Sequence, residues 1–88
     1  MPRRGVRTPA QVELGKRAKR RRKQLKLSQM ELADRIDLHF TFVSSVERGE
    51  RNLSLSSLLR LAEGLQMNPA ELVDGLRWEA LPAGSVSA

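Results

Sequence analysis

The residues with the clearest potential for chemistry lie between positions 28 and 49, where small polar and basic side chains alternate with spaced apolar ones. The apolar residues of this segment are Leu32, Ile36, Leu38, Val43 and Val46. The first two lie four positions apart and the last two lie three apart, so each pair shares one face of a helix. Leu38 lies between the two pairs and continues the helical spacing of neither. This pattern predicts two short amphipathic helices that meet at a tight corner.

The second of these helices would expose one row of side chains to solvent. The row consists of His39, Phe40, Thr41, Ser44, Ser45 and Arg48. Small polar groups and a guanidinium on an exposed helix suit the major groove of DNA, so these residues are the predicted base-reading set. Arg48 is the strongest single candidate, because a guanidinium can bridge guanine O6 and N7, although at the helix end it could instead bind a phosphate. For Phe40, packing on Leu38 and contact with a thymine methyl group remain equal alternatives.

The elements that must position this row are predicted to be helices throughout. Apolar spacing and capping residues indicate helices at about residues 11–25, 29–36, 40–48, 55–65 and 69–76. Ser28 and Glu31 predict a capping box at the start of the second helix. Asn68, Pro69 and Glu71 predict another at the start of the fifth. The expected fold is a compact, all-α, five-helix domain.

At three positions the predicted helices depend on the size or the backbone preference of a single residue. Asp37 occupies the corner between the second and third helices, where a positive φ is often needed and Asp accepts it better than most residues. Ala33 is small at a point where these two helices must come close. Gly15 is a weak point in the first helix, because glycine has low helix propensity.

Basic residues are concentrated in the N-terminal third of the chain. Residues 1–27 carry eleven of the sixteen Lys and Arg residues and a single acid, Glu13, whereas residues 28–88 carry five basic and nine acidic residues. Residues 1–9 are predicted to be a flexible arm, with Arg3, Arg4 and Arg7 reaching phosphates or a narrow minor groove. Residues 10–78 would form the domain and residues 79–88 a flexible tail. A basic pole favours a polyanionic partner; the plainer alternative is a solvated arm.

Composition argues against several other classes of protein. The chain of 88 residues contains no cysteine, and its single His39 has no cluster of metal ligands around it, so neither a metal site nor a cofactor is expected. No acid pair, nucleophile–base pattern or Gly-rich phosphate loop suggests an enzyme, and no small-molecule ligand is indicated. No apolar run is long enough for a membrane span, and no signal peptide is evident, so a cytoplasmic protein is expected.

Several separated motifs carry a resemblance to a known family. They are Leu27-Ser28-Gln29, Glu31-Leu32-Ala33, Leu38, Val43-Ser44, Val46-Glu47-Arg48-Gly49, and Leu58 through Ala62 followed by Leu65. In this order and spacing they resemble the lambda-repressor-like helix-turn-helix domain of Xre/Cro-type transcription regulators, over about residues 14–76. The run from Glu47 to Leu55 also resembles, more weakly, the dimeric controller proteins of restriction–modification systems.

The resemblance implies roles for particular residues. It places the third helix in the major groove and Gln29 against a phosphate, and Thr41 matches a common contact position. It also implies an ion pair between Glu47 and an arginine of the first helix, with Arg22 as the first choice. Further phosphate contacts are expected from Ser28, Arg17, Arg21 and Lys26. The chain departs from the family pattern at Asp37, where glycine is usual, and at Phe40, where a polar base-reading residue is common.

Two functions of different classes remain open at this stage. The leading one is sequence-specific binding of double-stranded DNA by a dimeric transcription regulator, because one small domain reads too few base pairs alone. Its predicted dimer interface lies on the fifth helix and comprises Leu72, Val73, Leu76 and Trp78. The alternative is an antitoxin-like or adaptor module whose main partner is another protein. The salt dependence of binding to mixed DNA separates the two.

Overall fold

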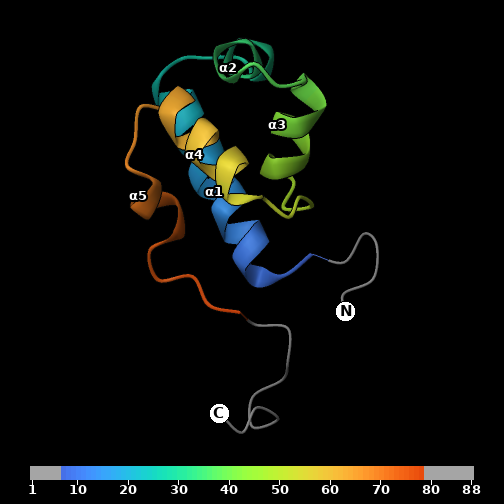
Figure 1. Ribbon diagram of the computed structural model, residues 1–88, viewed down its shortest axis with the longest axis vertical. Helices are drawn as coiled ribbons and strands as arrows, with labels where there is room; N and C mark the ends of the chain where they lie inside the picture. The colour runs from blue at the N-terminus through green and yellow to red at the C-terminus, as the bar shows by residue number, and fades with distance from the viewer. Residues whose placement is uncertain (1–6, 79–88) are drawn as a thin grey trace, which may run out of the picture.

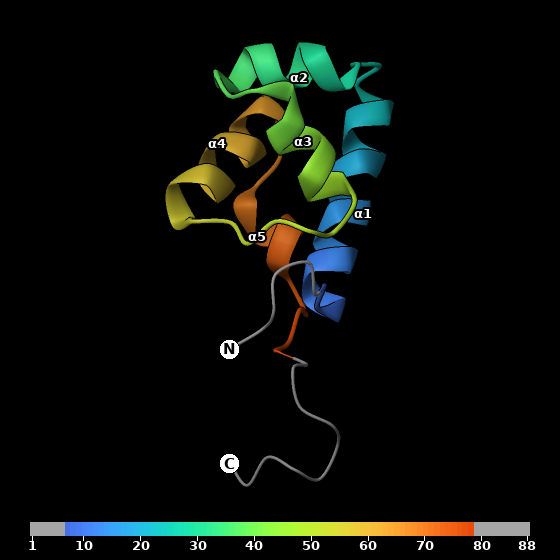
Figure 2. The same ribbon diagram turned by 90° about the vertical axis from the view of Figure 1, so that its right-hand side faces the viewer.

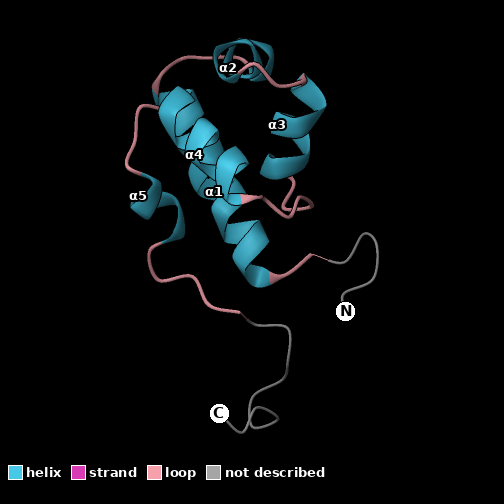
Figure 3. Cartoon of the chain, viewed as in Figure 1, coloured by secondary structure: helices cyan, strands magenta, loops and turns pink. Residues whose placement is uncertain are grey.

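The computed structural model describes residues 7–78, and these form five helices. The helices are α1 (Pro9–Gln24), α2 (Gln29–Ile36), α3 (Phe40–Glu47), α4 (Leu55–Gly64) and α5 (Pro69–Val73). In Figure 1, α1 and α4 lie at the centre, α2 crosses the top, and α3 and α5 lie on opposite sides. The described residues consist of helices and loops without a strand, which confirms the predicted all-α class (Figure 3).

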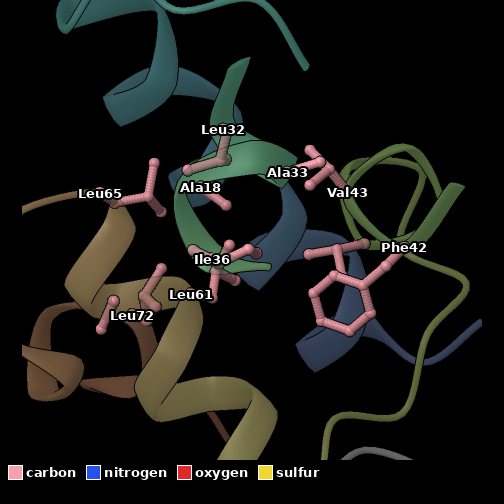
Figure 4. Packing of buried hydrophobic residues seen from close by; sticks show 11 residues of the cluster. Ala18, Leu32, Ala33, Ile36, Phe42, Val43, Leu61, Leu65 and Leu72 are labelled. Carbon is pink, nitrogen blue, oxygen red and sulfur yellow. The ribbon is translucent and has the colours of Figure 1, made fainter. Parts of the chain in front are cut away.

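The core is formed by apolar residues that the helical spacing brings to one side of each element. Its buried members are Ala18, Leu32, Ala33, Ile36, Phe42, Val43, Val46, Leu61, Ala62, Leu65 and Leu72 (Figure 4). They come from all five helices, so each short helix is stabilised by packing against the others rather than by its own propensity. Phe42, from the third helix, is buried with this cluster and does not belong to the exposed row.

The corner between α2 and α3 has the predicted conformation. Asp37 adopts the left-handed region with φ 56° and ψ 45°, which confirms the expected positive φ. Its backbone N–H donates to the carbonyl of Asp34, and the next N–H, from Leu38, donates to the carbonyl of Ala33. Arg60 of α4 then donates to the carbonyl of Asp37 at 3.0 Å. The turn that aims α3 is therefore held both locally and from α4.

The first and last helices differ from the sequence prediction in three ways. Helix α1 begins at Pro9 with Thr8 as N-cap, so these two residues belong to the helix and not to the predicted arm. Helix α5 ends at Val73, so Leu76 follows the helix instead of lying on it. At its start the Asn68 side chain accepts from the N–H of Ala70, not from that of Glu71 as a capping box requires. Short-range capping rules predicted where this helix starts but not its length.

Candidate nucleic-acid interface

The first turn of α3 presents three of the predicted base-reading residues on the molecular surface. His39 is the N-cap, and its Nδ1 accepts from the backbone N–H of Thr41 at 3.2 Å. Phe40 is 44% exposed, and its ring centroid lies 5.2 Å from that of His39. Figure 2 looks onto this side of the molecule, where α3 lies in front of the other helices. All three side chains therefore lie where a groove of DNA could reach them.

Arg48, the C-cap residue of α3, is held by neighbouring side chains. Its Nη1 donates to the hydroxyl of Ser44, and its Nε donates to a carboxylate oxygen of Glu50 at 3.0 Å. Both Arg48 and Glu50 remain exposed, so water screens their ion pair. The structure thus places Ser44 and Arg48 together one and two turns after Phe40, on the same side of the helix.

Ser45 differs from the other members of the predicted row because its hydroxyl bonds both to the backbone of α3 and to a side chain outside the row. It donates to the carbonyl of Phe42 at 2.9 Å and accepts from Nε of Arg51 at 3.1 Å. The guanidinium of Arg51 also lies over the ring of Phe42, 5.3 Å from its centroid. Arg51 was not among the predicted contacts, although it lies in the polar loop directly after α3. The structure makes Ser45 a support for this exposed arginine.

Behind α3 lies the ion pair that the resemblance implies. Nε of Arg22 donates to one carboxylate oxygen of Glu47 at 2.6 Å, and Nη2 donates to the other at 3.0 Å. The two side chains are only 10% and 4% exposed. The hydrogen bond to Glu47 raises the pKa of Arg22 above its ordinary value, so this guanidinium stays charged at neutral pH.

Two further groups complete the hydrogen bonding of this pair. Arg22 donates from Nη1 to the carbonyl of Leu27 at 2.8 Å, and Gln29 donates from Nε2 to Glu47 at 3.0 Å. The cluster thereby connects α1, α3 and the start of α2. Gln29 begins α2 directly after Ser28, the N-cap, whose hydroxyl accepts from the N–H of Glu31. Ser28 and Gln29 thus lie at a helix N-terminus, where backbone N–H groups favour a phosphate.

The basic residues of α1 fall into two groups that the sequence does not separate. Arg17 donates to the carbonyls of Glu71 and Asp74, and Arg21 donates to those of Leu65 and Gln66. These partners belong to α5 and to the end of α4, on the side of the molecule away from α3 (Figure 1). Arg17 and Arg21 were predicted to contact phosphates together with the residues beside α3. In the structure they lie away from α3 and are not part of its surface.

A second group on α1 consists of exposed side chains. Lys16, Lys19, Arg20 and Lys23 are exposed, and no carboxylate pairs with them within residues 7–78. Gly15 contacts the α3 backbone, so Lys19, one turn later, lies along the flank that α3 crosses. Lys23 follows Arg22, and exposed Lys26 lies in the turn before α2 with φ 59°. Lys19, Lys23 and Lys26 are therefore exposed cations on the part of α1 that α3 crosses and in the turn that leads to α2.

The predicted arm contributes one described residue to this face. Arg7 donates from Nη1 to the carbonyl of Arg48 at 3.0 Å, which brings the entrance of α1 to the C-terminal end of α3. The predictions for Arg3 and Arg4, and for the tail at residues 79–88, lie outside the described residues.

The predicted dimer residues are not all available to a partner. Leu72 is 0% exposed and belongs to the core of the single chain, so its assignment to the interface is wrong. Its burial follows from the packing of α5 on α4 and α1. Val73 and Trp78 are exposed, the latter at 70%. Val73 and Leu76 also line an apolar cleft of about 200 Å³, together with Leu14, Leu53 and Leu58.

Residues 7–78 contain no group of three or more His, Cys, Asp or Glu side chains that could hold a metal ion. No helix in the same range is long and apolar enough to cross a membrane.

The chain matches the family model described as "Helix-turn-helix" over residues 19–72. It is also similar to the restriction-modification controller protein C.AhdI from Aeromonas hydrophila, with 42% identity and a TM-score of 0.68, covering 70% of this chain and 94% of that one. The chain therefore belongs to the helix-turn-helix family of Xre/Cro-type DNA-binding transcription regulators.

The chain is also similar to a control protein and to a repressor. It is 42% identical over 48 residues to control protein C.BamHI of Bacillus amyloliquefaciens, and this match spans 54% of the chain and 59% of the relative. The P22 c2 repressor, solved in complex with synthetic operator 9T, is 33% identical with a TM-score of 0.66, covering 72% of this chain and 96% of that one.

Proposed function

We propose that the protein recognises a specific double-stranded DNA operator as a homodimer and acts as a cytoplasmic controller of transcription, of the kind found with restriction–modification systems. The observation that carries this proposal is the surface row on α3, formed by exposed His39, Phe40, Thr41 and Arg48 with half-buried Ser44 among them. Similarity to C.AhdI and C.BamHI supports the controller role. Similarity to the P22 c2 repressor supports an operator as the ligand.

The direct test is selection of binding sites from random DNA, carried out with the wild type and with Arg48→Ala. We expect the wild type to recover a two-fold symmetric sequence. Arg48→Ala should lose about 1–3 kcal/mol on that sequence and little on random DNA, with changed preference at one or two positions of each half-site. If the variant lost both affinities equally and selected the same sequence, Arg48 would contact a phosphate instead of a base; a wild type that selected no sequence would refute the proposed function.

Phosphate contact is proposed for the free cations beside α3 and not for the arginines that bind α4 and α5. Two matched double variants separate these roles, since each removes two positive charges from α1. Lys19→Ala with Lys23→Ala should weaken binding to all sequences and reduce the salt slope by roughly one to two units. Its stability should change by less than about 0.5 kcal/mol, because both lysines are exposed surface residues.

The second double variant, Arg17→Ala with Arg21→Ala, should behave in the opposite way. It removes four hydrogen bonds to backbone carbonyls, so unfolding should become easier by about 2 kcal/mol while the salt slope changes little. Thermal melts and DNA titrations at several salt concentrations measure both quantities. If the salt slope changed more in the arginine variant than in the lysine variant, Arg17 and Arg21 would be phosphate contacts.

For the dimer we propose an interface built on Val73, Leu76 and Trp78, beside the apolar cleft that Val73 and Leu76 line. Val73→Asp with Trp78→Asp should give a monomer at micromolar concentration, because a dimer would bury two unpaired charges on each chain. Leu59→Asp is the control, since Leu59 is an exposed leucine on α4 outside this patch. Sedimentation velocity measures the result, and a Val73/Trp78 variant as dimeric as the control would place the interface elsewhere.

A further inference from the structure

The side chain of Arg48, at the end of α3, is held by two neighbours and keeps part of its guanidinium free. Nε donates to a carboxylate oxygen of Glu50 at 3.0 Å, and Nη1 donates to the hydroxyl of Ser44. Nη2 forms no hydrogen bond with any group of residues 7–78, so its two hydrogens are available to a ligand. The Arg48 side chain is 55% exposed and that of Glu50 is 39% exposed, so DNA that reached one would meet both.

Three exposed arginines of the described chain gather at this end of α3, and they differ in their charge balance. Arg7 donates to the carbonyl of Arg48 at 3.0 Å, and Arg51 donates to the hydroxyl of Ser45 at 3.1 Å. No carboxylate of residues 7–78 pairs with Arg7 or Arg51, whereas Arg48 has one beside it. The positive charge of Arg48 is therefore balanced locally, and the charges of the other two are not.

We propose that Glu50 is a specificity-determining residue, which keeps Arg48 from acting as a phosphate contact and leaves it to read a guanine. This inference rests on the proposed function, since it decides between the two roles open to Arg48 in a complex with DNA. The observation that carries it is a carboxylate bonded to Nε of an exposed arginine at the end of α3, whose Nη2 is available to a base.

The two possible ligands of Arg48 differ in how they attract an arginine. A phosphate is attracted chiefly by positive charge, so a guanidinium balanced by a carboxylate binds it weakly, and the carboxylate itself repels it. Water screens this repulsion in free solution, but DNA that approaches the pair displaces that water. Guanine is neutral and binds an arginine through its acceptors O6 and N7, for which the Nη2 hydrogens are free. Glu50 therefore weakens the binding of Arg48 to a phosphate more than its binding to guanine.

The salt dependence of binding to random DNA tests this effect of charge. Glu50→Ala should convert Arg48 into a phosphate contact, which steepens the slope of log K against log salt by about 0.9 and strengthens binding to random DNA. Discrimination between the selected operator and random DNA should fall roughly tenfold, because the guanine contact loses its advantage over the phosphate contact. Glu50→Gln keeps an oxygen that can accept from Nε but removes the charge, so it should steepen the slope equally. A glutamine variant with the wild-type slope would overturn the inference.

A double-mutant cycle shows whether Glu50 acts through Arg48. In the Arg48→Ala background, Glu50→Ala should leave the salt slope and the selected sequence unchanged, because no guanidinium is present to bind the phosphate. Glu63→Ala is the matched control, since it removes one exposed carboxylate from α4 and should leave slope and discrimination as in the wild type. The same slope change in the Arg48→Ala background or in the control would overturn the inference, because Glu50 would then act only through the net charge of the protein.

These measurements distinguish failure of the inference from failure of the proposed function. If the wild type selects an operator but Glu50→Ala changes neither slope nor discrimination, Glu50 is not a specificity determinant, while α3 can still read the operator. If the wild type selects no sequence, the proposed function fails and the inference fails with it.

Discussion

Glu47→Ala should lower the free energy of unfolding by about 3 kcal/mol, because it leaves the guanidinium of Arg22 charged and nearly buried without its partner. Gln29 would lose its acceptor at the same time. For a domain of this size the melting temperature should fall by roughly 12–24 °C. The expected loss is larger than for a surface pair, since the two side chains are excluded from water and accept or donate several hydrogen bonds each.

The coupling between Arg22 and Glu47 is measured by a double-mutant cycle with Arg22→Met, Glu47→Ala and the combined variant. We expect the combined loss to be well below the sum of the single losses, because removal of both charges leaves no buried ion unpaired. Glu50→Ala is the control, since Glu50 pairs with Arg48 at the surface and should cost no more than about 1 kcal/mol. Additive losses would show that Arg22 and Glu47 do not stabilise each other.

Gly15→Ala should destabilise the protein by about 3 kcal/mol and weaken specific DNA binding, although alanine is the better helix former. A Cβ at this position would collide with the carbonyl of Val46 and lie 3.0 Å from that of Glu47. Both obstacles are backbone atoms of α3, so the added methyl group can fit only if α1 and α3 move apart. That movement would displace the recognition helix from its place in the domain.

Gly75→Ala is the matched control for this substitution. Its Cβ would meet nothing within 4 Å, but the residue has φ 78°, so the cost should be about 1 kcal/mol of backbone strain alone. Thermal melts of both variants, together with titration of the selected operator, separate steric clash from backbone preference. A Gly15→Ala variant as stable as the wild type would mean that α1 and α3 tolerate a wider separation.

The correctly predicted features depend on short-range interactions. Ser28 caps α2 and bonds reciprocally with Glu31, and Asp37 adopts a positive φ, because these conformations depend on atoms only a few residues away. The apolar spacing of α2 and α3 likewise predicted buried Leu32, Ile36, Val43 and Val46. The Arg22–Glu47 contact joins distant parts of the chain, and only the family resemblance implied it before the structure showed it.

The remaining features depend on where elements far apart in the sequence meet. Arg17 and Lys19 are both basic residues of the first helix, and the sequence does not distinguish their roles. In the structure only Arg17 faces the carbonyls of α5. Leu72 was a plausible interface residue until the packing of α5 on α4 and α1 buried it. The chain by itself determined helix positions, caps and the exposed row of α3, because periodicity and capping act within a few residues. Only the tertiary structure decided which cations stay free and which apolar residues remain exposed.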